Sequence, residues 1–210
     1  MAYIDGQLTA HPYDRDKGLL IEKNREMIIL PESERLLFRR FTMNDAPLIF
    51  DLNSDPEVTM FTHDPITKPE EATRILRDVI IPQYEQYGYG RWAVHAKEDD
   101  RFIGYCGLKY RKERAETDLG YRFLRSEWGK GYATEAALAC IRTAFEQLHL
   151  DRIVARADVR NTPSLNVLEK CGLKKIGFDT VDGSLVKSYE LLAEDFPFHQ
   201  PQSPLYRSSI

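Results

Sequence analysis

Two glycines one residue apart stand where a strand-like segment gives way to a long amphipathic one. Residues 118–123 alternate like a strand, Gly129 and Gly131 follow a short turn, and apolar side chains recur at helical spacing from 131 to about 148. A helix that begins at glycines presents its unpaired backbone N–H groups without obstruction, and the positive end of its dipole attracts anions. The pattern therefore predicts a phosphate-binding helix N-terminus within an alternating α/β chain.

The rest of the chain supports an α/β (α+β) class. Alternation and turn signals predict strands at 35–41, 91–96, 102–109, 118–123, 152–159, 174–181 and 184–191. Apolar periodicity and caps predict helices at 46–52, 69–85, 131–148 and from 161 to about 170. Asp55-Pro56 and Asp64-Pro65 are expected to be turns. This order favours a mixed, mostly antiparallel sheet with helices on both faces.

Composition limits the functional classes. The chain has 210 residues, is 42% hydrophobic and carries a formal net charge of −4, so one globular domain is expected and no nucleic-acid partner is indicated. We expect an N-terminal extension at 1–30, a domain at 31–195 and a C-terminal tail at 196–210. No signal peptide or membrane-spanning run is apparent, and the three widely spaced cysteines indicate neither disulfides nor a metal site. A cytoplasmic protein with reduced thiols is expected.

Two common phosphate-binding motifs do not fit. A Walker A loop requires Ser or Thr after its lysine, whereas Lys130 is followed by Gly131-Tyr132, which argues against a nucleotide hydrolase. The segment 88–93 matches a loose GxGxxA pattern, but it follows a predicted helix and precedes a predicted strand, the reverse of a dinucleotide-binding fold.

The segment 128–136, WGKGYATEA, resembles the acetyl-CoA pyrophosphate loop of the GCN5-related N-acetyltransferases (GNAT), in the variant of the RimJ/RimL-type ribosomal-protein N-acetyltransferase branch. Segments 34–41, 118–124 and 161–173 resemble that branch's opening strand, its fourth strand and the helix after its fifth strand, in the same order. The resemblance implies a GNAT fold with a six- to seven-stranded sheet splayed between strands four and five. It also implies acetyl-CoA as cosubstrate and no metal.

The resemblance assigns a set of cofactor contacts. The backbone from Gly129 through Lys130, Gly131 and Tyr132 to Ala133 would hold the pyrophosphate, with Lys130 either adding charge or remaining solvated. The backbone of Phe123 and Leu124 would pair with the pantetheine amides as an added strand does. Asn161 would cap its helix and contact the pantetheine arm.

Two positions depart from the wider family. Ser126 replaces the usual Gln or Arg at the start of the loop motif, a position that varies in the branch. Leu168 stands where many members carry a tyrosine that protonates the departing thiolate. The resemblance to the branch implies that a serine, here Ser164, takes this role.

An amine must lose a proton before it attacks a thioester. Asp118 is the expected base or water-relay carboxylate, with Glu116 and a water chain as alternatives. The aromatic side chains of Tyr84, Tyr87, Tyr89 and Trp92 either line an acceptor pocket or belong to the core. Phe61 and His63 fall on the loop expected at the substrate side.

Two functions remain open on the sequence. The first is a cytosolic N-acetyltransferase that acts by direct attack in a ternary complex. Its acceptor is a primary amine, with a protein α-amino group favoured and a small amine such as a polyamine or amino sugar as the alternative. The second is a non-catalytic CoA-binding sensor or interaction module, which Leu168 supports and Ser164 and Asp118 oppose. The branch also allows a homodimer.

Overall fold

Seven strands form one sheet in the order β1-β2-β3-β4-β5-β7-β6. The computed structural model describes residues 29–62 and 64–197, so His63, most of the expected extension and most of the expected tail lie outside it. The strands are β1 (Leu36–Arg39), β2 (Arg91–Ala96), β3 (Phe102–Arg111), β4 (Glu116–Phe123), β5 (Arg152–Asp158), β6 (Lys174–Val181) and β7 (Ser184–Leu192). All seven predicted strands are confirmed, with ends that differ by up to two residues.

The contact between β4 and β5 is the irregular point of the sheet. Every other neighbouring pair is antiparallel over several residues, whereas β4 and β5 are parallel and share, within the described chain, one registered pair, Asp118 with Val154. Beyond Asp118 the two strands diverge. The predicted splay between strands four and five is therefore confirmed, and it leaves the end of β4 without a strand partner on one side.

The helices are α1 (Ala46–Ser54), α2 (Pro56–Thr59), α3 (Pro69–Ile75), α4 (Ile81–Tyr87), α5 (Tyr132–Arg142) and α6 (Thr162–Lys170). The predicted helix at 69–85 is present, but a π-helical stretch, Leu76–Ile80, joins α3 to α4. A second one, Thr143–Gln147, extends α5. The helix α2 was not predicted. It forms because the Asp55 carboxylate accepts the Glu57 backbone N–H at 2.9 Å and Pro56 occupies the first turn.

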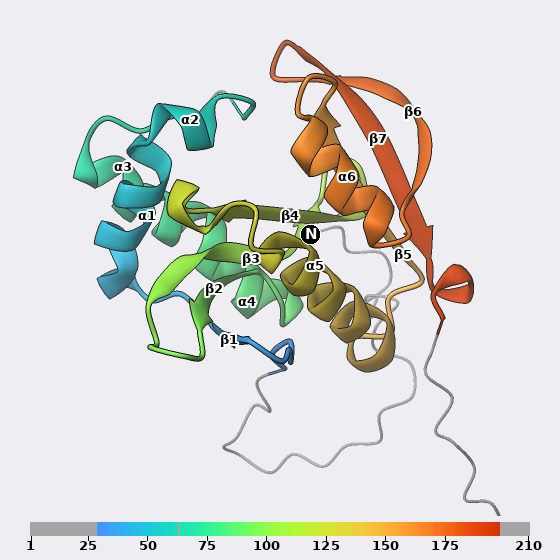
Figure 1. Cartoon of the computed structure of the whole chain (residues 1–210), viewed down its shortest axis with the longest axis horizontal. Coiled ribbons are helices and arrows are strands. Elements are labelled where there is room, and N and C mark those ends of the chain that lie inside the picture. The colour runs from blue at the N-terminus through green and yellow to red at the C-terminus, as the bar shows by residue number, and fades with distance from the viewer. Residues whose placement is uncertain (1–28, 63, 198–210) are drawn as a thin grey trace, which may run out of the picture.

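Helices cover both faces of the sheet (Figure 1). The helices α5 and α6 lie in front of the strands in this view, while α4 lies behind β2 and β3. The core between these layers contains most of the aromatic group whose role the sequence left open. Tyr84, Tyr89 and Trp92 are buried in it, and Tyr87 packs against its edge. These positions favour a role in core packing for the group.

The turns and caps follow from local chemistry. Thr42 and Asp45 form a reciprocal capping box before α1. Asp182 and Gly183, at φ 48° and 79°, make the tight turn between β6 and β7, as the Asp-Gly signal predicts. Among the described residues no helix is long and apolar enough to cross a membrane. The same residues include no group of three or more His, Cys, Asp or Glu side chains arranged to hold a metal ion.

The helix α6 is anchored by its apolar face, and this anchoring generates a stability prediction. Leu168 is 2% exposed, whereas Leu185 on β7 is 53% exposed. We expect Leu168→Ala to lower the free energy of unfolding by about 2–5 kcal/mol, because truncation leaves a cavity. The matched Leu185→Ala should change it by less than about 0.5 kcal/mol. Urea denaturation measures both, and equal effects would contradict the assigned packing.

Candidate functional site

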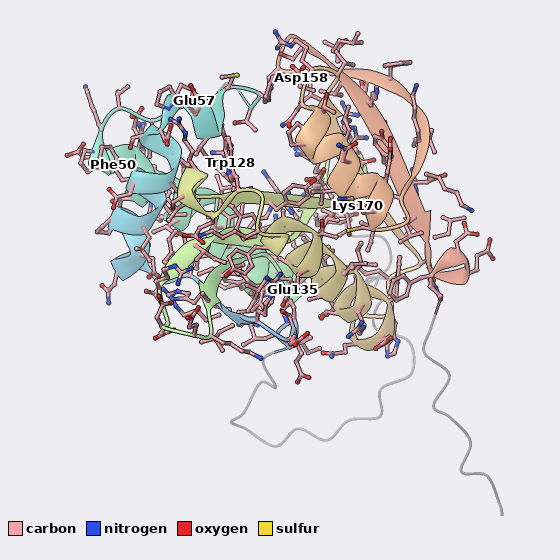
Figure 2. The ribbon with its side chains drawn as sticks, viewed as in Figure 1. Phe50, Glu57, Trp128, Glu135, Asp158 and Lys170 are labelled. Carbon is pink, nitrogen blue, oxygen red and sulfur yellow. The ribbon has the colours of Figure 1, made fainter. Side chains whose placement is uncertain are left out.

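A cleft of about 420 Å³ opens where β4 and β5 separate. Its walls come from α2, the end of β4, the loop before α5, and α6. In Figure 2 the labelled Glu57, Trp128 and Lys170 mark three of these walls. The predicted site residues that line it are Phe123, Gly129, Gly131, Tyr132, Ala133, Asn161 and Ser164. The remaining predicted residues, Asp118, Leu124 and Lys130, lie outside the described lining.

The N-terminus of α5 faces this cleft. Gly129 and Gly131 have φ values of 78° and 82°, which favour glycine, and Gly131 is the N-cap residue. The first intrahelical bond runs from the Glu135 N–H to the Gly131 carbonyl at 3.1 Å, and no side chain of the described chain caps the helix. The N–H groups of the first turn are therefore available to an anion, with the helix dipole in their favour.

Glu135 ties this loop to the start of β1. Its carboxylate accepts hydrogen bonds from the Ser33 hydroxyl, from the Arg35 backbone N–H at 2.8 Å and from the Arg35 Nε at 2.6 Å. Burial raises the pKa of Glu135, but these hydrogen bonds outweigh it and the pKa is lowered overall. Arg35 also donates to the Lys130 carbonyl at 3.2 Å and lies over the Tyr132 ring. The loop before α5 is thus fixed to the start of β1 by contacts on the side away from the cleft.

Lys130 forms a second ion pair at this loop, with Glu127. Its ammonium group lies 3.0 Å from the buried carboxylate of Glu127, which also accepts from Arg101 at 3.2 Å. Burial raises the pKa of Glu127, and the bonds from Arg101 and Lys130 more than reverse this shift. Lys130 therefore fixes the shape of the loop through Glu127, and its side chain is directed to that carboxylate.

The exposed edge of β4 is set by the two-residue period of a strand. Leu124 donates its N–H to the Ile103 carbonyl of β3 and accepts the Glu127 N–H, both at 2.9 Å, so its backbone groups are already bonded. Backbone N–H groups alternate between the two sides of a strand. Because the N–H of Leu124 points to β3, those of Tyr121 and Phe123 point to the other side, into the gap toward β5. The Phe123 carbonyl accepts the Trp128 indole N–H at 2.9 Å. The backbone of Leu124, which was expected to pair with the cofactor, is thus bonded within the protein.

Asn161 and Ser164 meet at the start of α6. The Asn161 Oδ1 accepts the Ser164 N–H at 3.2 Å, so Asn161 caps the helix as its residue type predicts. The Ser164 hydroxyl lies 2.9 Å from the hydroxyl of Tyr121 on β4. Leu168 belongs to the hydrophobic core and is not among the residues that line the cleft, so its side chain offers no proton donor there.

Asp118 lies at the vertex where β4 and β5 part. Its buried carboxylate is 2.6 Å from the Arg91 guanidinium and 3.4 Å from that of Arg111. Glu116, the alternative base, is paired with Arg156 at 2.6 Å. Both carboxylates are thus engaged by arginines away from the described cleft lining.

Arg122 joins β4 to the wall that carries α2. This buried side chain donates to Asn53 at 2.5 Å, to Thr62 at 2.7 Å and to Asp64 at 2.7 Å. On the same wall Phe61 lines the cleft, and the Arg160 guanidinium lies 5.8 Å from its ring centre. The position of His63 lies outside the described residues.

Sequence reasoning missed several lining residues. Tyr121 falls within the block that resembles the fourth strand. The available signal was the two-residue alternation of the strand, which places Tyr121 and Phe123 on the same side near its end. Trp128 is half exposed at the cleft rim beside the glycines, where a large apolar residue is itself informative. Arg122 gave no signal, since a charged residue on a strand ordinarily faces water.

Comparison with known proteins agrees with this geometry. The family profile described as "Acetyltransferase (GNAT) domain" matches residues 35–174. The N-acetyltransferase p20 of Bacillus licheniformis is 32% identical over 163 residues, which cover 75% of this chain and 91% of that protein.

Solved structures show the same architecture. The acetyltransferase of Agrobacterium tumefaciens strain C58 superposes with a TM-score of 0.67 at 25% identity, covering 81% of this chain and 98% of that one. The Vibrio cholerae spermidine N-acetyltransferase, solved with CoA and spermine, superposes with a TM-score of 0.65 at 18% identity, covering 77% and 97%. By its profile match, its curated relative and its splayed sheet, this chain belongs to the GNAT family of acetyltransferases.

Proposed function

We propose that this protein transfers an acetyl group from acetyl-CoA to a primary amine in a ternary complex bound at the cleft between β4 and β5. The observation that carries the proposal is the continuity of two features. The unpaired edge of β4 leads directly to the glycine-bounded, uncapped N-terminus of α5. An extended amide-bearing arm and a pyrophosphate need these two surfaces in that order.

The loop suits a pyrophosphate. A Cβ atom placed on Gly129 would meet nothing within 4 Å, so the glycine borders open space, and at Gly131 it would approach only Arg35, at 3.5 Å. The N–H groups from Gly129 to Ala133 would hold the phosphate oxygens. Tyr121 and Phe123 would pair their N–H groups with the pantetheine, and Asn161, whose Oδ1 is used as a cap, would contact that arm through its Nδ2.

The donor supplies an acyl group on a thiol leaving group. As the amine nitrogen bonds to the acyl carbon and the C–S bond breaks, the electron pair stays on sulfur. Ser164 would donate its hydroxyl proton toward that sulfur and regain one from the water that took up the amine proton. Because Asp118 is buried against two arginines, water is the preferred acceptor of the amine proton and Asp118 the anchor of the vertex.

The acceptor would enter along the wall that carries α2, where Glu57, Val58 and Phe61 line the cleft. A carboxylate beside apolar groups suits the cationic form in which an amine arrives. A protein N-terminal α-amine is the first candidate, on the resemblance of 128–136 to the ribosomal-protein branch. Small amines, including polyamines such as the substrate named for the Vibrio cholerae protein, form the second.

The proposal predicts amine-dependent release of thiol. The protein should release CoA from acetyl-CoA with at least one member of a panel of N-terminal peptides, polyamines and amino sugars, and mass spectrometry should find the acetyl group on nitrogen. Ser164→Ala should lower kcat by about 10- to 100-fold, because an oriented proton donor is lost. Ser54→Ala, on the exposed end of α1, is the matched control. CoA binding without any thiol release would favour the sensor alternative.

The loop assignment predicts the effect of charge at Gly131. Gly131→Glu should weaken CoA binding at least about 100-fold, because it places bulk and a negative charge where the phosphates would lie. Gly183→Glu in the β6–β7 turn introduces the same side chain at a similar φ, 79°, and controls for backbone strain. Isothermal titration calorimetry measures both dissociation constants, and unchanged affinity in Gly131→Glu would refute the assignment.

Asp118→Asn separates an anchor from a base. We expect it to lower the free energy of unfolding by about 3 kcal/mol, because Arg91 and Arg111 lose their buried counter-charge. The pH dependence of kcat for the folded enzyme should keep its shape. Asp78→Asn, which breaks an exposed pair with Arg77, should cost under about 1 kcal/mol. A flattened pH–rate profile in Asp118→Asn would instead identify Asp118 as the general base.

A further inference from the structure

A phenol and a serine hydroxyl meet across the opening between β4 and α6. The Tyr121 Oη lies 2.9 Å from the Ser164 Oγ and donates to the Ser164 carbonyl at 3.0 Å. Both residues line the cleft. Tyr121 stands on the strand whose free edge faces the proposed pantetheine, and it reaches Ser164 from β4, whereas Leu168 belongs to α6 itself.

The proton count of this pair allows two arrangements. A phenol and a serine each carry one hydroxyl proton, and both oxygens also accept. When Tyr121 donates to the Ser164 carbonyl, its phenol oxygen can accept a hydrogen bond from the Ser164 hydroxyl. The Ser164 O–H then points away from the cleft. When Tyr121 donates to the Ser164 Oγ, the Ser164 O–H is free to point into the cleft.

The surroundings keep Tyr121 a donor. Burial raises the pKa of Tyr121, and the nearby Cys106 and Cys171 add to this, while its bond to Ser164 opposes it. The phenol therefore stays protonated over the range in which an amine substrate is deprotonated. It has a proton to give in a hydrogen bond, and it keeps that proton through the reaction.

We propose that Tyr121 is a positioning residue that donates to the Ser164 Oγ and so directs the Ser164 proton toward the departing sulfur. The inference rests on the proposed function, since it assigns a partner to the proton donor of that reaction. The bonds made and broken remain those given above, because Tyr121 exchanges no proton with substrate. The strand thus supplies an orienting hydroxyl in a protein whose helix carries a leucine at position 168.

A double-mutant cycle tests this role. Tyr121→Phe removes the hydroxyl and keeps the ring, Ser164→Ala removes its partner, and the third variant combines them. We expect Tyr121→Phe to lower kcat by about tenfold, the equivalent of one lost orienting hydrogen bond. Its CoA dissociation constant and Tm should change little. In the Ser164→Ala background the same change should leave kcat where it is, because the two residues act as one unit.

Tyr87→Phe is the matched control, since its ring packs on Tyr110 at 4.8 Å and lies outside the described cleft lining. Ser164→Thr keeps a hydroxyl and should retain more of kcat than Ser164→Ala, so Tyr121→Phe should lower kcat again in that background. This second pair keeps the test valid if either variant with alanine proves unstable.

Independent effects would overturn the inference. If Tyr121→Phe lowers kcat equally with Ser164 and with Ala at position 164, or leaves the wild-type rate unchanged while Ser164→Ala lowers it, Tyr121 does not orient Ser164. Unchanged kcat in Ser164→Ala, or no thiol release from any amine by the wild type, would instead remove the proposed donor or the proposed function first, and this inference with it.

Discussion

The early end of hydrogen bonding between β4 and β5 determines the rest of the site. Once the strands part beyond Asp118 and Val154, the N–H groups of Tyr121 and Phe123 face a gap. A strand edge with unsatisfied donors is costly unless something pairs with it. In this chain the gap leads to the N-terminus of α5, so one ligand that is extended at one end and anionic at the other can satisfy both.

The gap stays open because ion pairs hold its borders. Arg91 and Arg111 neutralise Asp118 at the vertex, and Glu135 and Glu127 fix the loop before α5 from β1 and from the β2–β3 turn. Side-chain bonds then span the opening, with Tyr121 reaching α6. The charged groups near the loop are thus largely committed to one another, which leaves backbone N–H groups as the principal surface for phosphate.

Much of this arrangement was predictable from local patterns. Gly129 and Gly131 marked the start of α5, Asn161 marked the cap of α6, and Asp182-Gly183 marked the turn of the last hairpin. Local patterns were insufficient where long-range contacts decide. Lys130 turns to Glu127 only three residues away, but Arg101 from the β2–β3 turn also pairs with that carboxylate, and the bonding of Leu124 depends on β3. No short window reveals these two distant partners. The helix α2 depended on one capping carboxylate in a segment that reads as a turn, and the partnership of Tyr121 with Ser164 depends on two elements 43 positions apart.

Amide chemical shifts measured with two ligands test the central claim most directly. CoA carries the pyrophosphate and pantetheine lacks it, so CoA should shift the amide resonances of Gly129, Gly131 and Phe123, whereas pantetheine should shift Phe123 and leave the two glycines in place. The amides of α4, behind the sheet, should not respond to either. Glycine amides that ignore CoA, or that respond equally to pantetheine, would contradict the account.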